Sequence, residues 1–502
     1  MNLGNQILLQ NALRHIQRQE LNKAQELLKR AQDSSPNDPD VLRFLSVVAA
    51  MKFDYDSALE LIDQVIGLTP DNAIAHSNRG NILKELNRCE EALVSLDNSI
   101  KLAPTYVEAY NNKGNVLQDL HRYEEALNWY DKAIALKSNY AEAYSNKGNA
   151  LELLHRHEEA MQNFDAAISI NPGYVDAYWH KAMGQLASGN YEMGWHNYEA
   201  RWSKSQPISF QYDNIPRLES LQNISGKSVL IWAEQGLGDT LQFCRYIKPL
   251  ADLGAAVTFV VQKPLMDVLG SLCCYCTLVE NIKQPEKNFD FQSPLLSLPL
   301  LFGTTPSTIP AAIPYLDIHL EKKSRFKSQL SQNNNLRVGL VWNGGFRKAS
   351  PELWAVNKRR NIELEQIAKL KDVTGVDFYS LQKGDPAESE LIVKGDILWP
   401  DIVNCVRYLD DFSDTAALIE NLDLVISVDT STAHLAGALG KPVWILNRYD
   451  SCWRWLRGRS DSPWYPSAKI YQQSKPGDWD RVIDKVKVDL QRLSNHLNDG
   501  KI

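Results

Sequence analysis

The chain has 502 residues, of which 44% are hydrophobic and 23% are charged, and its formal net charge at pH 7 is −7. This length exceeds what one hydrophobic core supports, so we expect roughly two to four domains, and the negative charge argues against general nucleic-acid binding. The sequence shows neither an apolar run long enough for a membrane span nor an N-terminal secretory segment, which predicts a cytoplasmic protein.

The N-terminal two-fifths of the chain repeats with a period of 34 residues. Small residues recur at the positions where paired helices approach closely, and Leu96, Tyr130 and Phe164 are expected to fill the space between the helices. One repeat alone could not bury its apolar face, so the repeats should stack into a solenoid. The recurring small residues are Ala24, Ala58, Ala92, Ala126 and Ala160, together with Gly80, Gly114 and Gly148.

The pattern resembles the tetratricopeptide repeat. This resemblance implies about five helix pairs over residues 1–202, stacked into a right-handed α-solenoid with a concave inner face.

A column of asparagines, Asn78, Asn112 and Asn146, lies two residues before each repeat glycine. Side-chain amides both donate and accept, so such a column could bind an extended peptide backbone of any sequence. The asparagines could equally be polar positions copied by duplication. The column resembles the asparagine ladder of O-linked N-acetylglucosamine transferases, and that resemblance implies an acceptor-binding role for these three residues.

The array ends in an aromatic segment, residues 191–202, whose side chains are expected to pack against the next domain. Residues 203–226 carry proline, serine and asparagine without periodicity, and we interpret them as a linker.

A strand–turn–helix–strand pattern begins after the linker and predicts a parallel α/β domain over residues 227–332. Residues 228–232 and 257–261 are the expected strands, and residues 240–253 the expected helix. The turn between them has too few glycines for a dinucleotide fingerprint. Its Gly236 and Gly238 could let a ligand approach the backbone, and Asp239 could be a helix cap or a catalytic group.

A second α/β domain is expected over residues 333–502, because apolar strands resume at 337–342 and 376–381. Polar loops follow both strands, at the edge where such sheets bind ligands. Arginine and lysine there would suit a diphosphate. The polar residues of these loops are Asn343, Arg359, Arg360, Gln382 and Lys383.

Residues 422–447 form the most informative segment of the second domain. They predict a buried strand (424–428), a polar turn, a helix closed by Gly440, and another strand. A helix N-terminus with hydroxyl side chains can bind a phosphate, although capping alone would also explain it. The polar residues of this turn and of the first helical turn are Asp429, Thr430, Ser431, Thr432 and His434.

Two stretches, EQGLGDTLQFCRY and VDTSTAHLAGALGKPVWIL, resemble glycosyltransferase family 9, whose members are heptosyltransferase-like. The likeness covers roughly residues 227–490, with Ser431 where the family usually has glycine. It implies the GT-B arrangement, in which two Rossmann-like domains face a cleft. The whole chain resembles bacterial tetratricopeptide-repeat glycosyltransferases.

The resemblance implies that Asp239 is the general base, which must reach the acceptor hydroxyl. No Asp-x-Asp pair of the kind that metal-dependent glycosyltransferases use is recognised, so we expect a reaction without a metal ion or cofactor, in which fixed donors stabilise the leaving diphosphate. His434 could instead be a packing residue. The residues expected at the nucleotide-sugar donor are Gly236, Gly238, Thr240, Asn343, Arg359, Arg360, Gln382, Lys383, Asp429, Thr430, Ser431, Thr432 and His434.

These features together predict transfer of a sugar from a nucleotide sugar to a Ser or Thr hydroxyl of a protein held by the repeats. Relatives suggest flagellin or a surface adhesin as the acceptor. Two alternatives stay open at this point. One is a transferase acting on lipopolysaccharide or another glycan, with the repeats docking a partner, and the other is a non-catalytic scaffold with a nucleotide-sensing domain.

Overall fold

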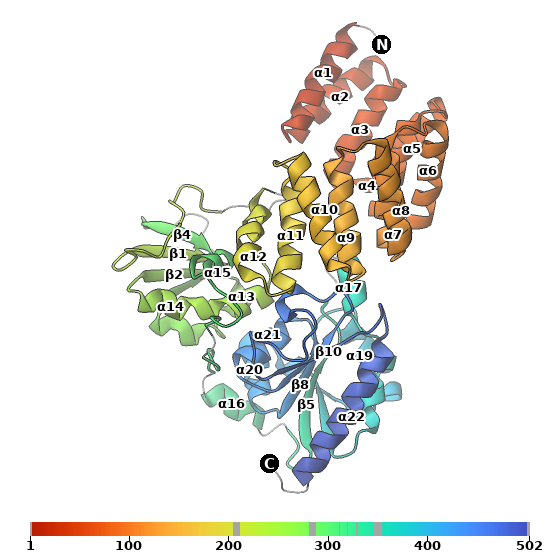
Figure 1. The fold of residues 1–502 in the computed structure, drawn as a ribbon. Helices are drawn as coiled ribbons and strands as arrows, with labels where there is room; N and C mark the ends of the chain where they lie inside the picture. The colour runs from red at the N-terminus through yellow and green to blue at the C-terminus, as the bar shows by residue number, and fades with distance from the viewer. Residues whose placement is uncertain are drawn as a thin grey trace. The chain divides into compact units, whose positions relative to one another are not determined.

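The computed structural model describes residues 3–203, 211–280, 288–310, 312–318, 320–327, 330–345 and 354–498. The chain forms two compact units, Met1–His180 and Lys181–Ile502. The first unit is helical, and the second contains two parallel sheets with helices beside them (Figure 1). This confirms the predicted α-solenoid followed by an α/β region.

The first unit contains five antiparallel helix pairs among its described residues, as the repeat period predicts. The last helix to begin in this unit, α11, extends into the second. The helices are α1 (Leu3–Gln17), α2 (Leu21–Ser34), α3 (Pro39–Met51), α4 (Tyr55–Leu68), α5 (Ala73–Glu85), α6 (Cys89–Leu102), α7 (Val107–Asp119), α8 (Tyr123–Leu136), α9 (Ala141–Leu153), α10 (His157–Ile170) and α11 (Val175–Ala187).

The repeat glycines allow close packing within each helix pair. A Cβ atom built on Gly114 would lie 2.4 Å from the ring of Tyr130, and one on Gly148 would lie 2.5 Å from the ring of Phe164. Both rings are fully buried. The large residues therefore fill the space that the glycines leave, as predicted.

We expect Gly114→Ala to lower the free energy of unfolding by roughly 1–3 kcal/mol, because the added methyl group overpacks against Tyr130. That ring has little freedom to move, since its hydroxyl donates to Asn115 at 2.8 Å. Urea unfolding followed by circular dichroism measures the change. Gly67→Ala is the matched control, because a Cβ on this exposed glycine of α4 meets nothing within 4 Å. The control should be neutral or stabilising by up to about 1 kcal/mol.

The aromatic segment that follows the repeats belongs to the second unit and is helical, with α12 (Tyr191–Tyr198) followed by the 3-10 helix η1 (Glu199–Trp202). Trp195 is 2% exposed, and its ring contacts those of Phe243 and Trp453 edge-on. The predicted packing against the next domain is confirmed. In the predicted linker 203–226, residues 204–210 lie outside the described part of the chain.

The first sheet is fully parallel with strand order β3-β2-β1-β4. The expected helix 240–253 is interrupted, since Pro249 has no N–H to bond the carbonyl of Arg245. The elements are β1 (Ser228–Trp232), α13 (Leu237–Phe243), α14 (Ile247–Asp252), β2 (Ala256–Val261), β3 (Cys276–Glu280), β4 (Phe291–Pro294), α15 (Leu298–Leu301) and α16 (Leu320–Lys327).

The second sheet is also parallel, with strand order β10-β9-β8-β5-β6-β7. Strands β8 and β9 are buried along their whole length, which their unbroken apolar runs predicted. The elements are β5 (Leu336–Val341), α17 (Trp354–Arg360), α18 (Leu364–Ile367), β6 (Val376–Ser380), α19 (Ala387–Leu398), β7 (Val403–Asn404), α20 (Phe412–Glu420), β8 (Leu424–Val428), α21 (Ser431–Ala438), β9 (Val443–Asn447), β10 (Ala468–Gln472) and α22 (Trp479–Asn498).

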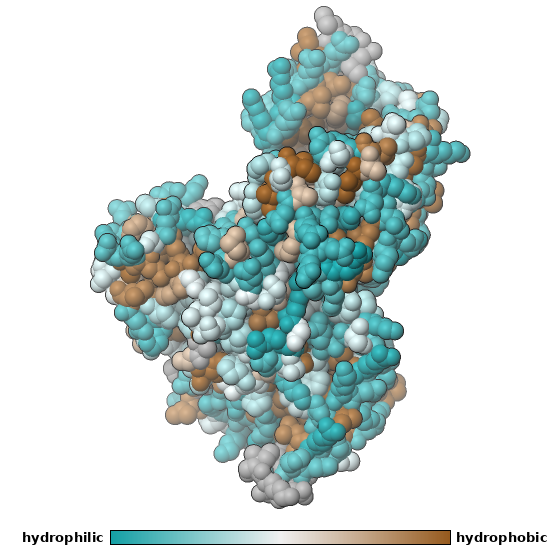
Figure 2. All heavy atoms as spheres, in the orientation of Figure 1, coloured by the Kyte–Doolittle hydropathy of each residue, from teal (hydrophilic) through white to brown (hydrophobic). Residues whose placement is uncertain are grey.

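Hydrophilic side chains cover most of the face shown in Figure 2, and apolar side chains gather there in separate patches. Among the described helices, none combines the length and apolar character that a membrane crossing requires.

Candidate functional site

A cavity of about 960 Å³ lies in the second unit, where the carboxyl ends of its two sheets face each other. Strands β1, β2 and β3 of the first sheet are followed by, or end in, lining residues. Strands β5, β6 and β8 of the second sheet are also followed by lining residues. These residues include Gly236, Lys263 and Glu280 from the first sheet, and Asn343, Gln382 and Asp429 from the second.

The strand order explains why the cavity forms here. In the second sheet the order reverses between β5 and β8, so the loops after these neighbouring strands diverge and leave a crevice. Asn343 follows β5 and Asp429 follows β8, and both line the cavity. In open α/β sheets, ligands bind at such a reversal.

The N-terminus of α21 opens into this cavity. Thr430 is its N-cap residue, and the Thr430 hydroxyl accepts from the N–H of Ala433 at 3.4 Å. The hydroxyls of Thr430 and Ser427 also hydrogen-bond, at 2.9 Å. Ser431 and Thr432 line the cavity beside them. Capping and ligand binding are therefore compatible here, because the N–H groups of a first helical turn can meet an anion.

Gly238 allows close packing between two helices at the cavity. A Cβ atom on this residue would lie 2.9 Å from Cδ2 of His434 and 3.4 Å from Cα of Ser431. The missing side chain therefore lets α13 approach α21 closely, and its expected contact with a ligand stays a prediction. Both residues still line the cavity.

His434 is 4% exposed and lies among aromatic side chains. Its ring stacks on Trp455 with centroids 5.1 Å apart, and its Nδ1 shares a hydrogen bond of 3.0 Å with the hydroxyl of Tyr465. Burial lowers the pKa of His434 to about 4, although Asp429 acts in the opposite direction. The imidazole is therefore neutral near pH 7, and it both packs and lines the cavity.

We expect His434 to make folding sensitive to acid. Because burial lowers its pKa from 6.5 to about 4, the unfolded chain binds this proton first as the pH falls from 6.5 towards 4. Its contribution to stability is complete above pH 6.5 and should decrease by about 2–3 kcal/mol by pH 4.5.

The measurement is the free energy of urea unfolding at pH 7.0 and 4.5, for the wild type and His434→Gln. The variant should lose less stability than the wild type between the two pH values. His196→Gln, at an exposed position of α12, controls for replacing a histidine. Equal losses in all three proteins would contradict the assignment.

Asp239 lies at the start of α13 and lines the cavity. Its Oδ2 accepts from the N–H of Gly236 at 3.0 Å, so this carboxylate does cap the helix. Its Oδ1 forms an ion pair with Nη2 of Arg454, which follows β9 in the second sheet. The carboxylate thus joins the loops of the two sheets at the cavity wall.

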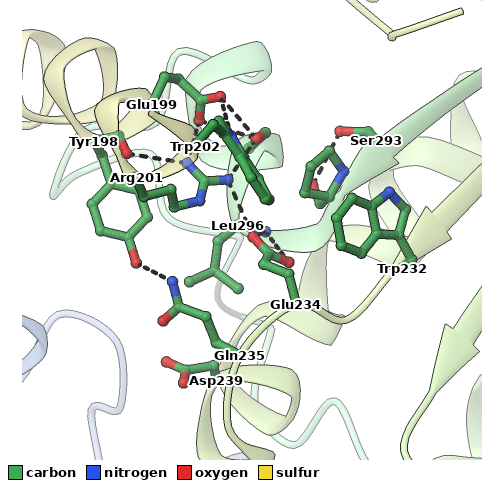
Figure 3. Close-up of polar contacts among 12 residues, drawn as sticks. Tyr198, Glu199, Arg201, Trp202, Trp232, Glu234, Gln235, Asp239, Ser293 and Leu296 are labelled. Carbon is green, nitrogen blue, oxygen red and sulfur yellow. Dashed lines mark hydrogen bonds and ion pairs between the residues drawn. The ribbon is translucent and has the colours of Figure 1, made fainter. Parts of the chain in front are cut away.

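The loop that carries Asp239 is anchored by a buried ion-pair network (Figure 3). Arg201 and Glu234 both have fully buried side chains, and Nη2 of Arg201 lies 3.1 Å from Oε1 of Glu234. Glu234 also accepts from the N–H of Leu296 at 3.1 Å. Gln235, the next residue, donates to the Tyr198 hydroxyl at 2.8 Å. Tyr198 of α12 therefore holds Gln235, and Arg201 of η1 holds Glu234.

Two residues expected at the donor lie outside the cavity lining. Thr240 is fully buried, and its hydroxyl donates to Oε1 of Gln262 at 3.0 Å. Arg359 lies on α17 rather than on the loop expected there, and its Nε pairs with Asp450 at 3.0 Å. Residues 346–353 of that expected loop lie outside the described residues. The other residues expected at the donor line the cavity: Gly236, Gly238, Asn343, Arg360, Gln382, Lys383, Asp429, Thr430, Ser431, Thr432 and His434.

Gln382 has a largely structural set of contacts. Its Oε1 accepts from the N–H of Asn343 at 2.9 Å, and its Nε2 donates to the Asn343 carbonyl at 3.0 Å. The side chain therefore fixes the turn after β5.

Sequence reasoning missed several lining residues. Lys263 and Asp267 follow β2, and Glu280 ends β3. Arg454 lies in a tryptophan-rich segment after β9. Its position beyond the carboxyl end of a predicted strand was the signal that could have identified it.

In the solenoid, the asparagine column connects neighbouring repeats. Asn112 donates from Nδ2 to the Ser77 hydroxyl at 3.1 Å, and Asn146 donates to Oδ1 of Asn111 at 3.0 Å. Asn78 occupies the same position on α5, and all three asparagines are partly exposed. Asn112 and Asn146 each have one donor committed to the array, and the role of the column in acceptor binding stays a prediction.

Comparisons with known proteins match both parts of the chain. Tetratricopeptide-repeat models match residues 9–73, 80–121, 114–154 and 141–174. The model of glycosyltransferase family 9 (heptosyltransferase) matches residues 410–475, which include β8 and α21. Protein FlbA of Caulobacter vibrioides is 26% identical over 334 residues, or 61% of this chain and 53% of FlbA. The chain thus spans about half the length of this curated relative.

Solved structures similar to this chain include a tetratricopeptide-repeat protein of Thermus thermophilus, with 21% identity and a TM-score of 0.35. That match covers 36% of this chain and 99% of the other. The type IV pilus biogenesis factor PilW has 20% identity and a TM-score of 0.36, and its match covers 40% and 94%. From the family matches, the chain combines tetratricopeptide repeats with a glycosyltransferase family 9 domain.

Proposed function

We propose that this protein is a cytoplasmic glycosyltransferase that moves a sugar from a nucleotide sugar to a Ser or Thr hydroxyl of a protein acceptor. The observation that carries the proposal is the cavity between two parallel sheets, which brings Asp239 together with the N-terminus of α21. The matched family 9 segment supplies that helix. The two facing sheets fit the GT-B arrangement.

In the proposed reaction, Asp239 takes the proton of the acceptor hydroxyl while the hydroxyl oxygen attacks the anomeric carbon of the sugar. The bond from that carbon to the diphosphate breaks, and its electron pair leaves with the nucleoside diphosphate. Hydroxyls and N–H groups of the first turn of α21 stabilise the departing charge, together with the guanidinium of Arg360. Donors that are already oriented suit a reaction without a metal ion.

Thermal-shift measurements against a panel of nucleoside diphosphates and nucleotide sugars test donor binding. We expect at least one nucleotide family to raise the Tm, because a ligand that binds only the folded state stabilises it. If no member of the panel changes the Tm, the transferase proposal fails.

The asparagine column supports a protein acceptor, because partly exposed amides recur along the array at one position per repeat. We expect the combined replacement of Asn78, Asn112 and Asn146 by alanine to raise the KM for a protein acceptor and leave donor hydrolysis unchanged. Steady-state kinetics with the acceptor measures the effect. An unchanged KM would remove the peptide-binding role and favour a glycan acceptor.

A further inference from the structure

The cationic side chains that line the cavity differ in their hydrogen-bond and ion-pair partners. Arg360 donates to the carbonyl of Asp429 at 2.9 Å and to Oδ1 of Asn357 at 2.8 Å. Lys383 donates to the carbonyls of Leu409 and Asp410. Uncharged oxygens accept these hydrogen bonds from both groups.

Arg454 is held differently, because its guanidinium pairs with the carboxylate of Asp239. The two side chains are only 12% and 17% exposed, so the pair is largely shielded from water. The other acceptor of Arg454 is the sulfur of Cys452, 3.3 Å from Nη1, and burial raises the pKa of this thiol and keeps it neutral. A neutral thiol is a weak acceptor, whereas a phosphate oxygen is a strong one.

An entering diphosphate would compete with Asp239 for this guanidinium. Two phosphate groups carry more negative charge than one carboxylate and match the planar fork of arginine. The ion pair of the ligand-free protein therefore faces a stronger competitor when a donor binds.

We propose that the donor diphosphate takes Arg454 over from Asp239, so that donor binding releases the carboxylate that accepts the proton of the acceptor hydroxyl. This inference rests on the proposed function and adds the order of its steps, in which donor binding comes before proton transfer to Asp239. Without a donor, Arg454 forms an ion pair with Asp239. With a donor, Arg454 stabilises the diphosphate, and the base becomes available when a leaving group is present.

Pyrophosphate is a suitable probe, because it contains the diphosphate without committing to a nucleotide or a sugar. Isothermal titration calorimetry of the full chain compares the wild type, Asp239→Asn, Arg454→Gln and the double variant. Asp239→Asn should tighten pyrophosphate binding about fivefold or more, because Arg454 is no longer engaged, and Arg454→Gln should weaken it about tenfold.

The double variant decides between exchange of Arg454 and simple repulsion. If Arg454 is exchanged, Asp239→Asn should change the affinity less than about twofold once Arg454 is absent. Asp267→Asn is the matched control, since this acid lines the same cavity and pairs with Lys322 at 3.5 Å instead. It should change the affinity less than about twofold in either background.

Equal tightening by Asp239→Asn with and without Arg454 would overturn the proposal, because it would show that the carboxylate only repels the ligand. The absence of tightening in the single variant would also overturn it. If pyrophosphate binds none of these proteins while a nucleotide sugar still raises the Tm, the exchange is wrong and the transferase proposal stands.

Discussion

Replacing Asp239 by asparagine should lower kcat for sugar transfer by about 10²- to 10⁴-fold, the usual contribution of a general base. Asparagine has nearly the same shape, and its side-chain oxygen can still accept from the N–H of Gly236. It cannot take the proton of the acceptor hydroxyl. The change thus separates proton transfer from helix capping, which alanine would not do.

Donor binding should survive in this variant, because none of the proposed diphosphate contacts is removed. The measurements are kcat with a saturating donor and the thermal shift that the same donor produces. Asp414→Asn is a matched control, since Asp414 is the corresponding capping-box residue of α20 and does not line the cavity. The control should retain kcat within about twofold, because a cap affects stability more than chemistry. Full turnover by Asp239→Asn would exclude Asp239 as the base.

The sequence predicted the elements of the second unit well where burial alone decides the structure. Strands β1 and β8 have the expected bounds, because a strand covered on both faces needs a continuous apolar run. The capping residues also followed from local chemistry. Thr430 caps α21 through its own side chain, as expected from a polar residue placed before an apolar helix.

The sequence predicted the location of the cavity better than it predicted the contacts within it. Polar loops after parallel strands meet at one edge, so eleven of the thirteen residues expected at the donor line the same space. Arg359 and Arg360 are adjacent in the sequence, yet only Arg360 lines the cavity. Neighbouring residues on a helix point in different directions, and no periodic pattern shows which one faces a ligand.

Contacts between distant segments were beyond sequence reasoning. Asp239 and Arg454 are 215 residues apart, and nothing local indicates that they pair. Gly238 shows the same limit, since its sequence context is that of a ligand-binding turn and only the structure shows that it also packs against His434. The aromatic segment was correctly expected to pack on the next domain, but its link through Arg201 to the loop that carries Asp239 required the structure.

Arg201→Met should lower the free energy of unfolding at pH 8 by about 3–5 kcal/mol, because it removes the buried guanidinium that pairs with both Glu199 and Glu234. Methionine approximates the volume of the arginine stem, so the loss reports mainly on charge. Burial raises the pKa of Glu234 to about 7 even with Arg201 present. Without Arg201 this pKa should rise further.

The raised pKa of Glu234 makes the stability of the Arg201→Met variant depend on pH. An acid with a raised pKa in the folded state contributes most below its unfolded value of 4.5, and the contribution is lost as the pH rises through the folded pKa. At pH 5 Glu234 is protonated in both folded proteins, and at pH 8 the wild-type carboxyl is largely ionised. The stability deficit of Arg201→Met should therefore grow by about 1 kcal/mol from pH 5 to pH 8.

Urea unfolding at the two pH values measures this difference, and Lys248→Met is the matched control. Lys248 forms an exposed pair with Asp252 at 2.6 Å, so its removal should cost less than about 1 kcal/mol at both pH values. An Arg201→Met deficit that is equal at pH 5 and pH 8 would show that lost packing causes it. A deficit that grows with pH would identify Glu234 as the buried charge that Arg201 balances, directly beside the loop that presents Asp239.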